Sequence, residues 1–136
     1  MSHRPLIKNG FLSMLFLALF GAMVVPMQQD IFKAVENSFT LGDAVQMEHI
    51  LSSSVELELP GEEEGIYSRS QTIAILNRFF ERFPPTSFRV RHSGHSASGA
   101  RFAVGDYLTE SERTFRVTIF AKKQGDDYLI QEIEFE

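Results

Sequence analysis

Two histidines, three residues apart, are the first candidates for a metal-binding or catalytic site in this chain. His92 and His95 form an H-x-x-H motif near the end of an alternating segment. Residues three apart on a strand point to opposite faces, so both rings could reach one metal ion only if Gly94 interrupts the strand. No third ligand of suitable spacing is nearby in the sequence. The motif therefore favours a partly buried His92 and a turn residue at His95, and we expect no metal and no cofactor.

An acidic residue is the second candidate. Asp106 continues the alternation of Phe102 and Val104, which places its carboxyl on the inner, apolar side of a strand. A glycine precedes it, and a bulge at this glycine would turn Asp106 outward and bring Tyr107 inward. Both arrangements stay open. The candidate polar residues of an inner pocket are therefore His92, Asp106, Tyr107 and Gln131.

Other reactive groupings are scarce. The acidic run Glu62–Glu64 lacks the Asp, Asn and Gly spacing of an EF-hand, so we interpret it as a solvated loop. The chain has no cysteine, which excludes disulfides, thiol catalysis and a lipoprotein anchor. No Ser–His–Asp set, phosphate loop or nucleotide fingerprint is present in the sequence. We therefore assign no catalytic residue.

One helix and the strands that follow it would position these side chains. The stretch 68–83 is the longest uninterrupted helical pattern outside the N-terminus. Ser68 and Gln71 match a capping box at its start, and Pro84 and Pro85 forbid its continuation. Such a helix must be covered on more than one side, because its apolar face is wider than the stripe of a surface helix. That face consists of Ile73, Ile75, Leu76, Phe79, Phe80 and Phe83.

Two short helices are predicted before the central one. Asp30 can cap a helix over Ile31–Leu41, which would end at Gly42. Asp43 can start a second helix over Ala44–Leu51. We expect this pair to form a lid over one end of the later sheet.

Alternating segments predict the strands. The first is Ser54–Leu59, and four more follow the central helix, with turns at Gly94–Gly99, Glu110–Glu112 and Gln124–Asp127. The last four form a meander of two hairpins, which is a natural cover for the helix. On the outer face we expect cross-strand ion pairs. The charged residues on that face would be Arg89, Arg91, Arg101, Arg116, Glu132 and Glu134.

The last hairpin also predicts an apolar patch on the outer face. Phe120, Tyr128 and Ile130 would lie together there, and contiguous apolar patches often mark interfaces. Arg116 and Glu132 would supply a polar rim. We therefore expect a homodimer formed through the outer sheet face, with a lone patch on a monomer as the alternative.

The N-terminal residues are interpreted as a targeting segment. Residues 1–27 would be a signal peptide or signal anchor, and residues 28–136 a single domain. Arg4 and Lys8 precede the uncharged apolar run Phe11–Val25, which is shorter than the roughly 20 residues that span a bilayer. This favours cleavage and a periplasmic or secreted protein. A membrane contact is expected only if the segment stays attached.

Charge disfavours nucleic acid as a partner. Residues 1–27 hold two of the 13 basic residues and none of the 18 acidic ones, so their removal lowers the formal charge from −5 to −7. Phosphate neutralisation by Lys and Arg supplies most of the non-specific affinity for nucleic acid. We therefore expect no nucleic-acid partner.

The order of these elements predicts an α+β fold. A curved antiparallel sheet would wrap around one long helix, with two short N-terminal helices beside it. This order resembles the cone-shaped fold of the nuclear-transport-factor-2-like (NTF2-like) superfamily. The segments DIFKAVENSFTLGDAVQM, VELELPG, GIYSRSQTIAILNRFFERFPPTSFRVRHSG and YLIQEIEFE are similar to an uncharacterised family of short exported bacterial proteins. That family is domain of unknown function 4783, found mostly in Bacteroidota.

The resemblance implies fold and export and brings no functional residue. Among enzymes that resemble the cone, an Asp or His in the pocket can act as a general base whose pKa is raised by apolar walls. Three functions therefore stay open. The chain could be a non-catalytic binding or accessory module for a small apolar ligand or a partner, a small acid/base enzyme of the isomerase, dehydratase or hydrolase type, or a homodimeric structural element.

Overall fold

The computed structural model describes residues 30–136, so the expected signal segment 1–27 lies outside the described residues. In the described part the helices are α2 (Ile31–Leu41), the 3-10 helix η1 (Ala44–Ile50) and α3 (Arg69–Arg82). The strands are β1 (Leu51–Glu58), β2 (Gly65–Ser68), β3 (Pro85–His95), β4 (Arg101–Thr109), β5 (Thr114–Gln124) and β6 (Asp127–Phe135). None of the helices in residues 30–136 has the length and apolarity needed to cross a membrane.

The first two helices are capped as expected. The Asp30 carboxylate accepts a hydrogen bond from the Phe32 amide at 3.2 Å, and Gly42 ends α2 in the left-handed conformation with φ of 68°. The Asp43 carboxylate accepts one from the Val45 amide at 3.1 Å and starts η1. The second helix is a tighter 3-10 helix and ends at Ile50, one residue earlier than expected.

The capping box of α3 is confirmed. The Gln71 amide donates to the Ser68 hydroxyl at 3.2 Å, and the Ser68 amide donates to the Gln71 side chain at 3.0 Å. The expected contrast between one long helix and two short ones is not confirmed, because α3 has 14 residues and α2 has 11. Burial is centred on one side of the expected face, so Ile73 and Phe83 are only half-buried. The buried residues of α3 are Thr72, Ile75, Leu76, Phe79 and Phe80.

The sheet has six strands in the order β2-β1-β6-β5-β4-β3. The expectation of a purely antiparallel sheet is wrong, because β1 and β6 pair in parallel. The alternation pattern could not reveal this, since strand direction depends on where α3 delivers the chain. Strand β2 was not expected either, because four residues are too few to alternate clearly. It pairs antiparallel with β1 at the edge of the sheet.

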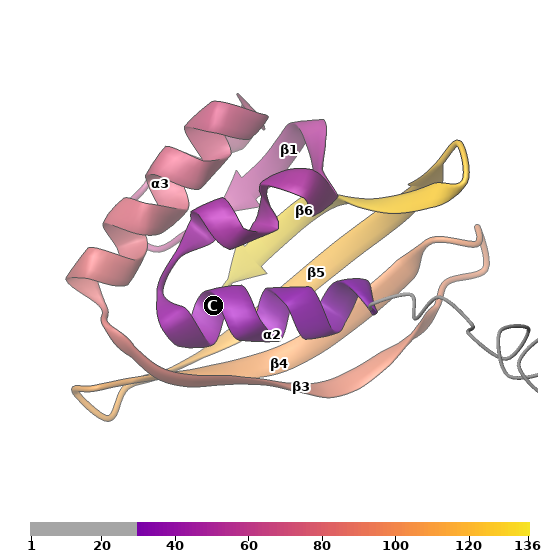
Figure 1. Ribbon diagram of the computed structural model, residues 1–136. Helices are drawn as coiled ribbons and strands as arrows, with labels where there is room; N and C mark the ends of the chain where they lie inside the picture. The colour runs from indigo at the N-terminus through magenta and orange to yellow at the C-terminus, as the bar shows by residue number, and fades with distance from the viewer. Residues whose placement is uncertain (1–29) are drawn as a thin grey trace, which may run out of the picture.

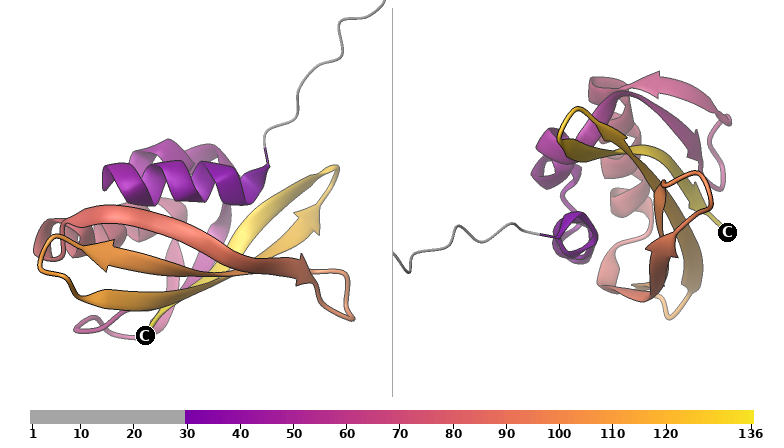
Figure 2. Two further views of the ribbon diagram at one scale, coloured as in Figure 1. Left: turned by 90° about the horizontal axis from the view of Figure 1, so that it is seen from below. Right: turned by 90° about the vertical axis from the view of Figure 1, so that its right-hand side faces the viewer.

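The helices lie together on one face of the curved sheet, while the other face carries no helix in residues 30–136 (Figures 1 and 2). Helix α2 runs beside the edge strand β3. The Thr40 hydroxyl accepts a hydrogen bond from the Phe88 amide at 3.1 Å, and the Glu36 carboxylate accepts one from the Val90 amide at 3.3 Å. Two free amides of the edge strand are thereby satisfied, which protects this edge from pairing with another chain.

The side chains of β4 point to the opposite faces of the sheet from those first expected. Ala103, Gly105 and Tyr107 point to the helices and are buried, so Phe102, Val104 and Asp106 face outward. No bulge at Gly105 causes this, since β4 pairs with β5 without a register shift. A Cβ at Gly105 would meet the Arg89 carbonyl oxygen and lie 2.9 Å from the Phe88 ring. The small residues of β4 therefore make room for large inner side chains, a requirement that alternation alone does not reveal.

Strand β6 contains a bulge that changes its inner face. Ala121 pairs with Ile130 and Phe120 pairs with Glu132, which leaves Gln131 as the extra residue. Ile130 is therefore fully buried, and Gln131 does not point inward as expected. The expected inner positions hold for Ile133 and Phe135, which follow the bulge.

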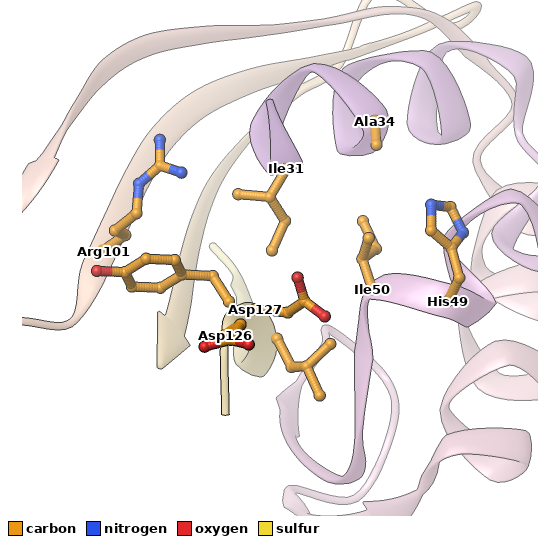
Figure 3. A pocket seen from close by; sticks show the side chains of 9 residues that line it. Ile31, Ala34, His49, Ile50, Arg101, Asp126 and Asp127 are labelled. Carbon is orange, nitrogen blue, oxygen red and sulfur yellow. The ribbon is translucent and has the colours of Figure 1, made fainter. Parts of the chain in front are cut away.

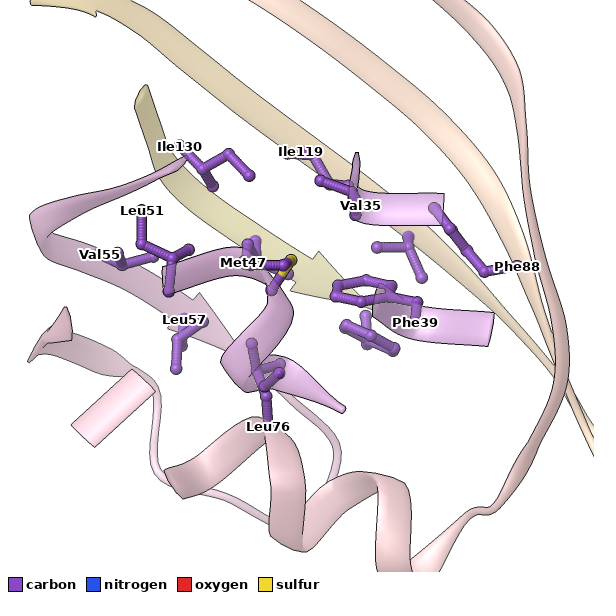
Figure 4. Close-up of a cluster of buried hydrophobic side chains, with 14 of the residues drawn as sticks. Val35, Phe39, Met47, Leu51, Val55, Leu57, Leu76, Phe88, Ile119 and Ile130 are labelled. Carbon is purple, nitrogen blue, oxygen red and sulfur yellow. The ribbon is translucent and has the colours of Figure 1, made fainter. Parts of the chain in front are cut away.

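Aromatic rings fill the space between helices and sheet. The Phe79 ring lies 4.7 Å from the Phe135 ring and 5.3 Å from the Phe115 ring, and Phe80 stacks on Tyr107 at 5.8 Å. Aliphatic side chains from α2, η1, β1 and α3 complete this core beside them (Figure 4). The concave side of the sheet is therefore occupied by packed side chains, as the abundance of phenylalanine predicts.

Candidate functional site

The structure does not bring the four expected pocket residues together. His92 is exposed on the outer side of β3, opposite Val104. Asp106 also faces outward, and its carboxylate accepts a hydrogen bond from Arg91 Nε at 2.8 Å. Gln131 lies at the bulge of β6 and lines a depression of about 330 Å³ on the outer face. Of the four, Tyr107 alone points into the interior.

The surroundings of Tyr107 indicate a structural role for this side chain. Its ring is completely buried among phenylalanines, and its hydroxyl donates a hydrogen bond to the Phe83 carbonyl oxygen at 2.6 Å. Burial raises the pKa of the Tyr107 hydroxyl well above its ordinary value. A neutral phenol with its proton engaged by a backbone carbonyl holds the end of α3 and has no role as a general base.

The H-x-x-H motif and the acidic run 62–64 lie apart in the structure of residues 30–136, and most of their side chains are exposed. His95 is exposed, and so are Glu63 and Glu64. Glu62 lies 3.8 Å from the Arg78 guanidinium. No group of three or more His, Cys, Asp or Glu side chains in the described part of the chain is arranged to hold a metal ion.

A pocket of about 410 Å³ opens where α2 begins and the β5–β6 hairpin turns (Figure 3). This mouth pocket lies within the usual size range of small-molecule sites. A second depression, between α2 and β3, is lined mostly by exposed side chains and is less enclosed. The residues of the mouth pocket are Ile31, Ala34, His49, Ile50, Arg101, Asp126, Asp127, Tyr128 and Leu129.

Arg101 is the fixed charge of the mouth pocket. We expected it on the outer face, but it follows the inner phase of Ala103. Its guanidinium carbon lies 5.0 Å from the centre of the Phe32 ring and 5.5 Å from that of Tyr128. Arg101 Nη2 also donates to the Asp30 carboxylate at 3.2 Å. Cation–π contacts and an ion pair therefore hold the guanidinium at the rim.

Two aspartates form the opposite wall. Asp126 and Asp127 lie in the hairpin turn, and neither carboxylate has an ion-pair partner among residues 30–136. Figure 3 shows the Asp127 side chain directed toward the space between Ile31 and Ile50, which are almost completely buried. The mouth pocket thus combines an aliphatic floor with acceptor groups that lack a cation. The mouth pocket was not predicted from the sequence, because the side chains of β4 were assigned to the wrong faces of the sheet.

The three expected interface residues are also separated. Phe120 faces outward as predicted, and its ring centre is 6.5 Å from that of Phe102. Ile130 is buried in the core, and Tyr128 lines the mouth pocket on the other side of the sheet. The expected patch is therefore wrong in composition, because the bulge in β6 turns Tyr128 and Ile130 toward the helices.

Comparisons with solved structures show the same fold. A DUF4783 family protein from Bacteroides ovatus is 25% identical, with a TM-score of 0.68 over 75% of this chain and 90% of that one. One from Bacteroides uniformis is 22% identical, with a TM-score of 0.71 over 79% and 96% of the two chains. An NTF-2 like protein of unknown function from Silicibacter pomeroyi is 14% identical, with a TM-score of 0.54 over 78% and 88%.

The fold is accordingly NTF2-like, an α+β architecture with a curved six-stranded sheet. No curated protein matches the chain. A family model matches residues 32–136, which is nearly all of the described part. With the family's solved members sharing its fold, the chain belongs to the family described as Domain of unknown function (DUF4783).

Proposed function

We propose that this chain is an exported, non-catalytic binding domain that holds a small amphipathic molecule in the mouth pocket. The observation that carries the proposal is the contrast between a filled interior and a lined opening at one end of the sheet. Small-molecule sites combine apolar walls with a few placed polar groups. The mouth pocket has this composition, whereas packed aromatic and aliphatic side chains fill the core in residues 30–136.

The charges of the mouth pocket favour a ligand with an aliphatic body and a cationic end. Arg101 is already paired with Asp30, whereas Asp126 and Asp127 have no such partner in residues 30–136. An alkylammonium group could lie against Asp127 while its chain covers Ile31 and Ile50. An anionic ligand would have to compete with Asp30 for the guanidinium and would meet the two aspartates.

An acid/base enzyme is the alternative reading of the fold, and no observation favours it. Such an enzyme needs a titratable group in a pocket that excludes water. His92 and Asp106 lie on the outer face, and the Tyr107 hydroxyl is engaged by Phe83.

Export is supported by the sequence of residues 1–27, and the intact mass of protein recovered from cells tests it. A chain that keeps these residues in the membrane fraction would be a signal anchor.

Calorimetric titration with hexylammonium, hexanoate and hexanol tests the ligand class. We expect hexylammonium to bind most tightly and Asp127→Asn to weaken it by roughly threefold to fivefold, as for a partly exposed charge pair. Glu110→Gln, in an exposed turn on another hairpin, is the matched control and should bind like the parent. Equal binding of hexanoate, or no effect of Asp127→Asn, would overturn the proposed ligand class.

A further inference from the structure

The depression of about 330 Å³ on the outer face of the sheet combines an aromatic wall with polar groups from four segments of the chain. It lies on the opposite face from the mouth pocket, and we call it the outer pocket. The three strands that form its floor contribute Phe120 and Lys122 from β5, Gln131 and Glu132 from β6, and Glu56 from β1. The turn between β3 and β4 forms the remaining wall.

Phe120 supplies the apolar wall of the outer pocket. Its ring is only half-buried, and it stands directly opposite Glu132 in the register of β5 and β6. The Phe102 ring lies beside it, with 6.5 Å between the two ring centres. The face of an aromatic ring carries negative charge density, so it attracts weakly positive C–H groups. A ligand ring with C–H groups on one side therefore fits against Phe120.

Two carboxylates lie next to this wall. Glu132 stands beside Glu56 in the parallel register of β1 and β6. Neither carboxylate forms an ion pair within residues 30–136, although Lys122 lines the same pocket. Partial burial and the charges of Glu56 and Glu58 raise the pKa of Glu132, while Lys122 lowers it. Donors from a ligand would stabilise both carboxylates, since hydrogen bonds to ionised acceptors are the strong ones.

The β3–β4 turn is held by its own hydrogen bonds and presents hydroxyl groups. The Ser96 amide donates to the Ala100 carbonyl oxygen at 2.7 Å, and the Gly99 amide donates to the Ser96 carbonyl oxygen at 3.0 Å. The hydroxyls of Ser96 and Ser98 are 2.8 Å apart and share one hydrogen bond. Because a hydroxyl can donate one hydrogen bond and accept two, this pair keeps capacity for a ligand. The Gln131 amide adds further donors and an acceptor.

We propose that the outer pocket binds a neutral sugar ring, with a C–H face of the ring against Phe120 and its hydroxyls donating to Glu56 and Glu132. Hydroxyl groups also accept, so the same ring can bind the serines of the turn and Lys122. The pocket volume lies at the lower end of the range for small-molecule sites, which fits a single ring. An anionic ligand would meet two carboxylates, a cationic one would meet Lys122, and an alkyl chain would leave the carboxylates without donors. This site is independent of the function proposed for the mouth pocket.

NMR titration of the nitrogen-15-labelled protein with the methyl glycosides of glucose, galactose, mannose and xylose tests the ligand class. We expect at least one glycoside, at millimolar concentration, to shift the amide signals of Ser98, Lys122 and Gln131. Cyclohexanol, a six-membered ring with a single hydroxyl, and the charged amino sugar glucosamine should each bind roughly fivefold more weakly or worse. No shift with any of the four glycosides would overturn the proposal. Equal or tighter binding of cyclohexanol or glucosamine would overturn the neutral sugar as the ligand.

Variants of the outer pocket test the placement of the ring. Phe120→Ala should abolish glycoside binding, and Glu132→Gln should weaken it by roughly threefold to tenfold, because an amide oxygen is a weaker acceptor than a carboxylate. Glu134→Gln, two residues further along β6 and outside the pocket lining, is the matched control and should bind like the parent. Asp127→Asn at the mouth pocket should also bind like the parent. Circular dichroism confirms that each variant is folded.

A second aromatic variant keeps the test decisive if Phe120→Ala does not fold. The chain has no tryptophan, so Phe120→Trp introduces a single fluorescent reporter at the wall of the pocket. Its emission should change as the glycoside binds, and the larger ring should bind the glycoside at least as tightly as Phe120 does. Unchanged emission at a glycoside concentration that shifts the NMR signals would overturn the stacked arrangement. Unchanged binding in folded Phe120→Ala would do the same.

Discussion

The inner and outer faces of the sheet carry different kinds of side chains. The inner face carries Tyr107, Phe115 and Phe135 against the rings of α3, and no charged side chain lies at its centre. The outer face carries like-charged neighbours, Glu56 beside Glu132 and Glu58 beside Glu134, that have no ion-pair partner in residues 30–136. Stability accounts for the first arrangement. The second is costly for an isolated domain, because like charges directly opposite one another destabilise a sheet.

The largest expected effect comes from truncating one ring on each face. Phe80→Ala should lower the free energy of unfolding by about 3–5 kcal/mol, because it removes a buried ring that packs on Phe39 and Tyr107. Phe120→Ala should cost less than about 1.5 kcal/mol in a monomeric sample, since its ring is partly exposed. Urea unfolding measures both. Equal losses would mean that the two faces do not differ in packing.

Glycine substitutions test the same difference between the two faces at the backbone. Gly105→Ala should destabilise the protein by about 1–3 kcal/mol, because the new Cβ would meet the Arg89 carbonyl and the Phe88 ring on the inner side. Gly94→Ala is the control, since its Cβ would lie 3.3 Å from the movable end of the Phe102 ring on the outer side. Thermal unfolding that ranks Gly94→Ala as the worse change would contradict the assigned phase of β4.

A smaller effect is expected from the one hydroxyl in the aromatic core. Tyr107→Phe keeps the ring but leaves the Phe83 carbonyl oxygen without its 2.6 Å hydrogen bond, which should cost about 1–2 kcal/mol. The far-ultraviolet circular dichroism spectrum should not change. An unaltered midpoint of urea unfolding would show that this hydrogen bond does not hold the end of α3.

The outer face should respond to pH more than the inner face does. A hydrogen bond with the Glu136 side chain, partial burial and the charges of Glu58, Glu136 and Glu132 raise the pKa of Glu134 from its ordinary 4.5 to about 7. The folded state therefore binds this proton more tightly, so its stabilising contribution is complete below pH 4.5 and is lost as pH rises through about 7. Glu134→Gln should gain melting temperature relative to the parent across this window. A constant difference between pH 4 and 8 would contradict the shift.

Local signals in the sequence predicted the elements well. The capping residues Asp30, Asp43 and Ser68 act within one helical turn, and each was confirmed. The phases of β4 and of the first half of β6 were wrong. Phase depends on which face has room for side chains, and the space that Phe88 needs at Gly105 comes from a distant part of the chain. The Gln131 bulge is likewise a property of pairing between strands.

These errors in the phase of the strands also explain why the mouth pocket was not predicted. Arg101 and Tyr128 were expected on the outer face, and each lies on the helical side, where they line the same pocket. His92 was expected inside and lies outside, and of the two arrangements left open for Asp106 the structure has the outward one. Shifting the alternation of a strand by one residue moves every side chain of that strand to the other face. Candidate sites on strands therefore depend on register much more than those at helix caps do.

The proposed binding site is the mouth pocket and not the interior of the cone. Methyl-labelled NMR with hexylammonium tests it most directly, because isoleucines report both regions. We expect chemical-shift changes at Ile31, Ile50 and Leu129, with none at Ile119 and Ile133. Asp127→Asn should reduce those shifts at the same ligand concentration. Shifts confined to Ile119 and Ile133, or the absence of any shift at the mouth pocket, would contradict binding at the mouth pocket.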